Sequence, residues 1–332
     1  PSAAYDTTSN RIVVAYKDDG NSNYGTVLVG TVSSGSISFG TAVVFASAYS
    51  AFMGVAYDSN ANRTVIVYSD AQSDGNAIVG TVDPSDNSIS FGSPAEYNGT
   101  GVSKQAITFD STANKVVIVY KGDSQHGHII VGTVNPSNNS ISFGADNEWQ
   151  TAQTNEPIVN YDSNANKSVI TYVDAANSDK GAARVATVSG TSISLGSEVI
   201  FHDATTSRLV SIFDSTNNKI VAAYRDGGSN VGQARVGTVD GTSISFQSSV
   251  QFEAGATSDI AIGFDSINGK VVISYTDDGD SGKGKAVVGT VSGTNISFTD
   301  PIEFESGDVK HQAIGFDPDT SQSIIFYCDA DD

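Results

Sequence analysis

The stretch Gly263-Phe264-Asp265-Ser266-Ile267-Asn268-Gly269-Lys270-Val271-Val272-Ile273-Ser274-Tyr275-Thr276-Asp277 recurs seven times, with substitutions, along the 332-residue chain. Its first Asp returns every 51 or 52 residues, and a Tyr follows ten residues after each one. The Asp series is Asp6, Asp58, Asp110, Asp162, Asp214, Asp265 and Asp317, and the Tyr series is Tyr16, Tyr68, Tyr120, Tyr172, Tyr224, Tyr275 and Tyr327. A unit of this size is too small to bury its own apolar surface, so neighbouring units must pack together. The period therefore predicts a repeat architecture.

Each repeat contains four segments with the pattern of strands. The first ends at the recurring Asp, which we name the ladder Asp, and a residue that tolerates a left-handed backbone follows four residues later. These turn residues are Asn10, Asn62, Asn114, Asn166, Asn218, Gly269 and Ser321. The second strand, such as 115–120, is apolar on both faces, and a tight turn joins the third and fourth, such as 286–291 and 295–298. We expect the ladder Asp to accept hydrogen bonds from turn amides and the recurring Tyr to pack between repeats.

No helical period is present in the chain, so other sheets must cover both faces of the second strand. The sequence predicts an all-β fold, a seven-bladed β-propeller of four-stranded antiparallel blades, with a stacked solenoid as the alternative. We expect one propeller domain over residues 1–332, with repeats near 1–50, 51–102, 103–154, 155–206, 207–257 and 258–309 and a partial repeat at 310–332. Because the sequence begins at Pro1 in the middle of a repeat, without an initiator Met, we expect a fragment of a longer or processed protein. The last repeat stops after its second strand. The seventh blade would be incomplete in this chain or closed by residues from outside it, such as those before Pro1.

The chain is strongly acidic, with 17 basic and 37 acidic residues and a formal net charge of −20. A field of this sign repels phosphate backbones, so we expect no nucleic-acid partner. No apolar run approaches the length of a membrane span, so we expect no membrane insertion. The single cysteine, Cys328, excludes an internal disulfide, and its place in a strand pattern predicts a small buried apolar side chain.

The sequence contains no recognisable catalytic motif, and we expect the protein not to be an enzyme. The Asp-box of sialidases would fall between the third and fourth strands, where this chain reads Ser-Gly-Thr at 189–191. A carboxylate pair for glycoside hydrolysis stays open, because acidic residues are abundant and only geometry decides.

Two groups of residues are candidates for metal binding. His126 and His128 share one loop as His-Gly-His, with solvated loop residues as the alternative. Asp277, Asp278 and Asp280 resemble a calcium loop by composition, but their spacing is incomplete and turn chemistry is the alternative. We therefore expect no cofactor, with Ca²⁺ as the open alternative.

The positions that differ between copies are the candidates for function, because folding of the repeat does not determine them. Six residues before the ladder Asp, the chemistry changes in every copy: the residues are Phe52, Lys104, Glu156, Arg208, Asp259 and His311. We expect them where the loop from the fourth strand enters the next first strand, on a face at the mouth of the channel. Loops on a rigid scaffold often carry recognition, although an unconstrained surface is the alternative. Tyr24, Tyr49 and Trp149 are candidate stacking platforms for a sugar or a protein.

The phrases Asn-Lys-Val-Val-Ile-x-Tyr-x-Asp, Val-Gly-Thr-Val-Ser-Gly-Thr-x-Ile-Ser-Phe and Phe-Gly-Ser-Pro resemble a repeat of large structural and tail-fibre-like proteins of marine bacteriophages, notably those of cyanobacteria. The resemblance covers essentially the whole chain. It implies an extracellular, virion-borne propeller that attaches to a host surface or decorates the particle, and it carries no catalytic residues. The copies at 121–128 and 322–328 depart from the pattern.

Three hypotheses follow from the sequence. The first is a binding module on a virion fibre or surface protein that recognises a host-surface glycan or protein through one loop face. The second is a structural spacer or decoration that packs on other virion or surface subunits. The third is an enzyme that degrades polysaccharide. The sequence leaves the ligand, the host and the oligomeric state open.

Overall fold

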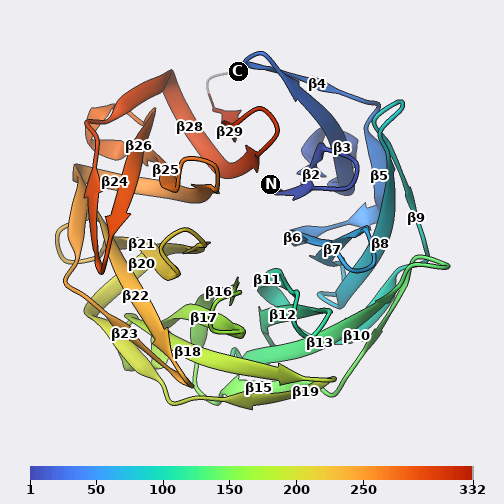
Figure 1. Cartoon of the computed structure of the whole chain (residues 1–332), viewed down its shortest axis with the longest axis horizontal. Coiled ribbons are helices and arrows are strands. Elements are labelled where there is room, and N and C mark those ends of the chain that lie inside the picture. Colours follow the sequence, from blue (N-terminus) through green and yellow to red (C-terminus); the bar gives the residue numbers. More distant parts are fainter. Residues whose placement is uncertain (331–332) are drawn as a thin grey trace. The chain divides into compact units, whose positions relative to one another are not determined.

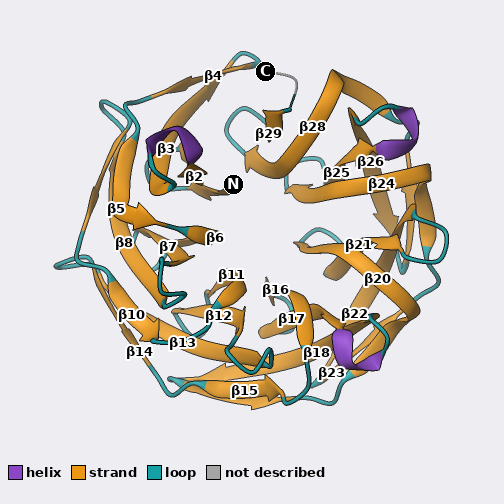
Figure 2. Cartoon of the chain, turned by 180° about the vertical axis from the view of Figure 1, so that it is seen from behind, coloured by secondary structure: helices purple, strands orange, loops and turns teal. Residues whose placement is uncertain are grey.

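The computed structural model describes residues 1–330, and their regular secondary structure consists almost entirely of strands joined by turns and loops (Figure 2). They divide into two compact units, Pro1–Gln153 with Val188–Ser194, and Thr154–Thr187 with the described residues from Leu195 onward. The helices are three short 3-10 turns, η1 (Asp19–Asn21), η2 (Ala175–Asn177) and η3 (Asp278–Asp280). No helix among residues 1–330 combines the length and the apolar character that a membrane span requires.

The first unit contains three antiparallel sheets, one for each of the first three repeats (Figure 1). Its strands are β1 (Ser2–Asp6), β2 (Arg11–Asp18), β3 (Tyr24–Ser33), β4 (Ser36–Phe39), β5 (Val43–Tyr49), β6 (Ala51–Asp58), β7 (Arg63–Ser69), β8 (Gly75–Asp83), β9 (Ser88–Phe91), β10 (Ala95–Asn98), β11 (Ser103–Asp110), β12 (Lys115–Lys121), β13 (Gly127–Asn135), β14 (Ser140–Phe143) and β15 (Asn147–Gln150). In each sheet the first three strands pair in chain order, and the fourth is divided into two pieces that both pair with the third. The predicted antiparallel meander is therefore confirmed, with an interrupted fourth strand.

The second unit repeats this arrangement in sheets that share long strands. The remaining strands of the chain are β16 (Thr154–Asp162), β17 (Lys167–Asp174), β18 (Lys180–Ser189), β19 (Ser192–Leu195), β20 (Val199–Asp214), β21 (Lys219–Asp226), β22 (Val231–Asp240), β23 (Ser243–Phe246), β24 (Val250–Asp265), β25 (Lys270–Asp277), β26 (Lys283–Ser292), β27 (Asn295–Phe298), β28 (Ile302–Asp317) and β29 (Gln322–Asp329). The segment Val188–Ser194, which includes the end of β18 and most of β19, is assigned to the first unit. Strands β20, β24 and β28 have 16 residues each, and each finishes one sheet and begins the next. The link between repeats in this unit is thus continuous strand rather than loop.

The turn after each first strand has the predicted structure. In the third repeat, Asp110 is buried, and its Oδ1 accepts hydrogen bonds from the backbone amides of Thr112 at 3.0 Å and Ala113 at 2.8 Å. The turn residue Asn114 follows with φ 54°. The other turn residues also have positive φ, so the ladder Asp fixes the turn and the residue four places later accepts its left-handed backbone.

The recurring Tyr packs between successive repeats, as expected. In the first unit, the ring of Tyr97 from the fourth strand of one repeat lies 5.3 Å from that of Tyr120 in the next. In the second unit, Phe252 and Tyr275 repeat the contact at 5.5 Å. A buried aromatic pair of this kind contributes about 0.5–1.5 kcal/mol beyond the area that it buries. Tyr68, Tyr224 and Tyr327 make the same contact with Phe45, Phe201 and Phe304, which explains why this position does not vary.

The prediction for Cys328 was wrong. This residue lies in β29, as its pattern indicates, but its side chain is exposed. Among the described residues, β29 pairs only with β28, whereas the second strand of each earlier sheet has a third strand on its other side. Tyr327 in the same strand is 38% exposed, while Tyr275 one repeat earlier is fully buried. Burial of the second strand therefore depends on the third strand and not on the repeat sequence alone.

Candidate functional site

The six variable residues lie inside the first strands, at a bulge, and not in the preceding loops as expected. The strand pairing skips two residues in each case: between Ala51 and Gly54, Ser103 and Ala106, Asn155 and Ile158, Ser207 and Val210, Ser258 and Ala261, and Lys310 and Ala313. Two residues thus face one on the neighbouring strand, which defines a β-bulge. The variable residue is the first of the two. We name these six residues the bulge residues.

All six bulge residues have a left-handed backbone. Their φ angles are 48° at Phe52, 48° at Lys104, 50° at Glu156, 55° at Arg208, 42° at Asp259 and 54° at His311. Glycine is the usual residue at such a bulge, because an L side chain in this conformation costs roughly 1–2 kcal/mol. No copy has glycine or asparagine at this position. Each repeat therefore retains a strained backbone together with a side chain.

The turn residues provide a comparison within the same repeats. They have φ angles between 54° and 61°, but five of the seven are Asn and one is Gly. Asn and Gly adopt this backbone at little cost. Where the left-handed conformation serves only the turn, the chain uses the residues that suit it. At the bulge it uses six different residues, so the side chain itself is the feature that is retained.

The two residues of each bulge differ in how deeply their side chains are buried. In the third repeat Lys104 is exposed and Gln105 is buried; in the fifth, Arg208 is exposed and Leu209 is buried. In these two bulges the second residue anchors the bulge in the protein and the first side chain is presented to solvent, while Glu156 and Asp259 are half-buried. The bulge re-aims this side chain, since its position would otherwise follow the regular alternation of the strand.

In the first unit, two bulge residues are in contact. Strands β6 and β11 pack side by side (Figure 1), and the Nζ of Lys104 lies 5.7 Å from the centroid of the Phe52 ring. The Phe52 side chain is 44% exposed. Tyr49, three residues earlier, is 46% exposed, and the Nζ of Lys17 lies 5.8 Å from its ring centroid. This part of the surface combines exposed aromatic rings with ammonium groups.

In the second unit, strands β16, β20, β24 and β28 pack side by side in that order. Their bulge residues, Glu156, Arg208, Asp259 and His311, occupy equivalent places on these neighbouring strands. Two acidic residues thus alternate with an arginine and a histidine. Glu156 also reaches the next bulge, where its Oε2 accepts a hydrogen bond from the backbone amide of Leu209 at 2.9 Å. This row presents charged groups of both signs.

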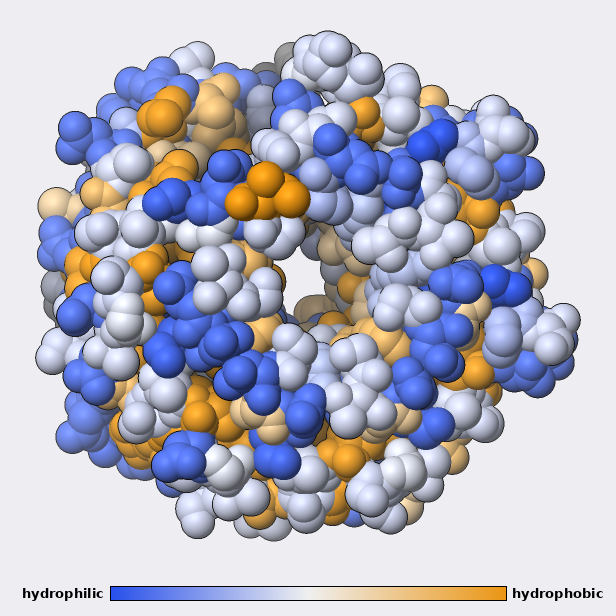
Figure 3. Space-filling model, in the orientation of Figure 1, coloured by the Kyte–Doolittle hydropathy of each residue, from blue (hydrophilic) through white to orange (hydrophobic). Residues whose placement is uncertain are grey.

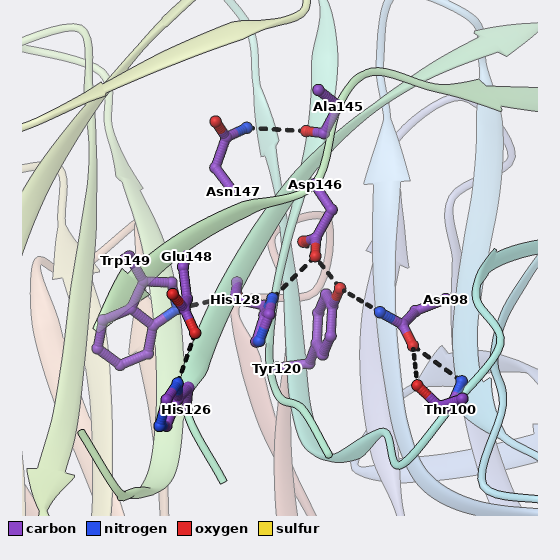
Figure 4. A network of polar contacts seen from close by, with 10 residues as sticks. All are labelled: Asn98, Thr100, Tyr120, His126, His128, Ala145, Asp146, Asn147, Glu148 and Trp149. Carbon is purple, nitrogen blue, oxygen red and sulfur yellow. Dashed lines mark hydrogen bonds and ion pairs between the residues drawn. The ribbon is translucent and has the colours of Figure 1, made fainter. Parts of the chain in front are cut away.

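The third repeat carries a second polar cluster, on β12 and β13 beside the turn where the copy departs from the pattern (Figure 4). The Nδ1 of His128 lies 2.8 Å from the Oδ2 of Asp146, and Tyr120 donates a hydrogen bond to the Oδ1 of the same carboxylate at 2.8 Å. The rings of His128 and Tyr120 are stacked, with centroids 5.2 Å apart. Gly122 replaces the Asp found in all six other copies and makes room, because a Cβ there would lie 2.7 Å from the His128 ring.

The electrostatics of this cluster favour an ion pair. The hydrogen bond to Asp146 raises the pKa of His128, although partial burial opposes this. Burial raises the pKa of the Asp146 carboxyl, but hydrogen bonds from His128 and Tyr120 outweigh it and hold that pKa below its usual value. His126 makes an equivalent contact with Glu148 (Figure 4). Each histidine has one ring nitrogen held by a carboxylate, which fixes its orientation.

The metal candidates are not supported as clusters. Within residues 1–330, no group of three or more His, Cys, Asp or Glu side chains could hold a metal ion. The Nζ of Lys285 lies 2.7 Å from the Oδ2 of Asp277 and 2.9 Å from that of Asp280, and Asp278 accepts a hydrogen bond from Ser258. A lysine therefore already occupies the place where a cation would be attracted, so the contacts of this loop favour the turn-chemistry alternative over calcium.

The predicted stacking platforms have different environments. Trp149 is only 1% exposed, and its Nε1 donates to the carbonyl oxygen of His128 at 2.8 Å, so it is a core residue and cannot be a platform. Tyr24 is half-buried opposite Tyr49 in the β3–β5 pairing. Only Tyr49 has the exposure that stacking requires. The sequence placed Trp149 at the correct position in the repeat. It could not show that Gly127 leaves room beneath the Trp149 ring: a Cβ at residue 127 would lie 2.3 Å from that ring.

Repeated antiparallel sheets whose first strands pack side by side within each unit are typical of the blades of a β-propeller. No family model matches the chain, and no curated protein matches it. Solved structures do. The BP39L lectin from Burkholderia pseudomallei is 14% identical with a TM-score of 0.69, covering 99% of this chain and 92% of its own. The periplasmic gluconolactonase PpgL from Pseudomonas aeruginosa is 11% identical with a TM-score of 0.67, and the match covers 98% of this chain and 87% of PpgL. A protein from Lactobacillus plantarum is 11% identical with a TM-score of 0.66, covering 90% and 83%.

At these identities the similarity shows the fold alone. The chain is an all-β protein with the fold of β-propellers, as the sequence predicted. The similar structures include a lectin and a lactonase, so a binding protein and an enzyme are both represented among proteins of this fold. The site must therefore decide between them.

Proposed function

We propose that this chain is a non-enzymatic carbohydrate-binding propeller that recognises a host-surface glycan through its bulge residues. The observation that carries the proposal is the strained backbone at six equivalent positions, each with a different side chain and none with glycine. Strain that folding alone would remove is a reason to infer function at the strained position. The similarity to the BP39L lectin is consistent with a carbohydrate ligand.

The surface supports recognition of a polar ligand. On the face drawn in Figure 3, hydrophilic residues are interspersed with smaller groups of apolar ones. The bulge residues add charged groups of both signs and one exposed aromatic ring. Such a mixture suits a ligand that offers hydroxyl groups and apolar C–H faces together. A protein receptor is the other partner that the sequence left open, and it is an outcome of the test below.

The test separates binding from folding by glycine substitution. Variants Phe52→Gly with Lys104→Gly, and Arg208→Gly with His311→Gly, keep the left-handed backbone but remove the side chains. The matched control is Asn62→Gly with Asn114→Gly, which changes left-handed positions in the turns. We expect both bulge variants to fold and to lose binding on a glycan array and to host cells, while the turn variant keeps both. Unaltered binding by both bulge variants contradicts the proposal, and binding to host protein without glycan binding assigns the site to a protein receptor.

We also propose that the propeller acts outside the cell, on a virion fibre or a surface protein, next to other virion or surface subunits. The support for this location is the resemblance of the repeat to tail-fibre-like proteins. A decoration or spacer role without ligand binding is the alternative. Immunogold labelling of purified particles that carry this protein tests the location, since the proposal requires label on the particle exterior.

A second candidate function is hydrolysis, favoured by one specific observation. His128, near the start of β13, is oriented by Asp146 at 2.8 Å and its side chain is partly exposed, which is an arrangement that general bases use. The gluconolactonase PpgL has the same fold. Turnover of gluconolactone or of a polysaccharide that is lost in both His128→Gln and Asp146→Asn would support it. Turnover that is unchanged by either substitution would assign the cluster a structural role.

A further inference from the structure

The bulge residues of the first unit differ from those of the second in the kind of surface that they make. Phe52 and Lys104 place an exposed aromatic ring and an ammonium group 5.7 Å apart. Tyr49 and Lys17 repeat this pairing at 5.8 Å. Tyr49 and Phe52 are separated by three residues, which span at most about 10 Å. One short oligosaccharide can therefore reach both pairs.

The charge of Lys104 is not neutralised by the protein. Among residues 1–330, its ammonium group makes no ion pair, and its close partner is the ring of Phe52. Lys121 lies near it, and the pKa of Lys121 is lowered first by burial and then by the positive charge of Lys104. Other lysines of the described residues do form ion pairs, as Lys180 does with Asp203 at 2.7 Å and Lys285 with Asp277. Two neighbouring cations, one of them without a counter-ion, are retained in a chain whose net charge is −20.

The ring of Phe52 and the ammonium group of Lys104 have complementary chemistry. An aromatic ring offers an apolar platform for the C–H face of a pyranose. An ammonium group beside the ring offers a charge-assisted hydrogen bond to a carboxylate or a sulfate. Lys17 attracts an anion less strongly than Lys104 does, because the Nζ of Lys17 already lies 2.9 Å from the Oδ1 of Asp19. The strongest attraction for an anion is therefore at Lys104, with Tyr49 as an additional platform.

We infer that Phe52 and Lys104 form a subsite for an anionic sugar residue, so that the ligand of the first unit is an acidic polysaccharide. The inference rests on the proposed carbohydrate-binding function and specifies its ligand class. The ring of Phe52 stacks on the sugar, and Lys104 binds its acidic group. Lys121 raises the local positive potential. The unpaired lysine thereby gains the counter-ion that the protein does not supply.

The experiment uses a glycan array of matched pairs, in which each uronate-containing or sulfated oligosaccharide is printed beside its neutral parent. The full chain is compared with Lys104→Gln, Lys104→Arg and Phe52→Ala. We expect the full chain to prefer acidic members at least about tenfold over their parents, and Lys104→Gln to lose that preference. Lys104→Arg retains it, because the charge is kept. Phe52→Ala weakens acidic and neutral members alike. Raising the salt from 0.05 to 0.5 M should weaken only the acidic members, because screening acts on the charge.

The outcomes separate this inference from the function on which it rests. Binding of neutral parents as tightly as acidic members overturns the anionic subsite and leaves the carbohydrate-binding function in place. An acidic preference that survives Lys104→Gln also overturns the subsite. Absence of binding to every member overturns both. The separate responses to uronate and to sulfate identify which acidic group is bound. Circular dichroism of each variant confirms that it is folded.

Discussion

Six repeats contain both a turn residue and a bulge residue with a left-handed backbone, and the residues at these two positions follow opposite rules. In the third repeat they are Asn114 in the turn, with φ 54°, and Lys104 at the bulge, with φ 48°. The turn position holds Asn in five of seven copies, whereas the bulge position never holds the same residue twice. The backbone requirement is the same, so the difference must come from what the side chain does. At the turn the residue type meets the requirement of the left-handed backbone, because Asn adopts it at little cost. At the bulge, side chains such as Lys104 are exposed to solvent.

The largest expected effect tests the anchoring of the turn. Asp110→Ala removes a buried carboxylate that accepts two backbone amides. We expect the free energy of unfolding to fall by about 2–3 kcal/mol, because hydrogen bonds to a charged group are lost and buried donors are left unsatisfied. Urea unfolding measures it. Asp259→Ala at a bulge is the matched control, for which we expect a change below about 0.5 kcal/mol; equal losses at both positions would remove the distinction.

The next effect compares the two left-handed positions directly. Asn114→Ala should lower the free energy of unfolding by about 1 kcal/mol, because alanine is strained where asparagine is not. Lys104→Ala should change it little, since lysine carries the same strain already. Thermal unfolding of the two variants checks this. If Lys104→Ala destabilises the protein as much as Asn114→Ala does, then the bulge side chain has a structural role.

The polar cluster of the third repeat gives a pH-dependent effect. The pKa of His128 is raised in the folded protein, so its contribution to stability is present below the unfolded pKa of about 6.5 and is lost as pH rises through the folded value. The pKa of Asp146 is lowered, so its contribution is lost only in acid. We expect His128→Gln to cost on the order of 1 kcal/mol near pH 5.5 and less near pH 8. A cost that does not change between these two pH values would contradict the ion pair.

The smallest effect has the opposite sign. Lys104→Gly relieves the strain of about 1–2 kcal/mol but adds freedom to the unfolded chain worth about 0.5–1 kcal/mol. We expect a net stabilisation of about 0.5 kcal/mol, visible as a small rise in the midpoint of thermal unfolding. Asn114→Gly should change stability by less than this. A clear loss of stability in Lys104→Gly would mean that the side chain is held by contacts with the protein.

The candidate site could be predicted in part. Comparison of the copies identified all six bulge residues, because a position that changes in every repeat cannot be set by the fold of the repeat. It could not show the bulge, since one extra residue in a strand leaves no mark when the whole period stays at 51 or 52. The loop placement was therefore wrong. The polar cluster at His128 was also missed as a cluster, although the replacement of Asp by Gly122 in a single copy was a visible signal.

By itself, the sequence determined the architecture of this protein. The ladder Asp, the turn residue and the recurring Tyr are local requirements of one turn and one packing contact, so they repeat and can be read from one copy. Only the tertiary structure decided which side chains are available to a ligand. Trp149 and Tyr49 are both aromatic residues near the ends of fourth strands, yet one is 1% exposed and the other 46%. Exposure depends on which neighbouring sheet covers a residue, and that is a property of the packed repeats rather than of any single one.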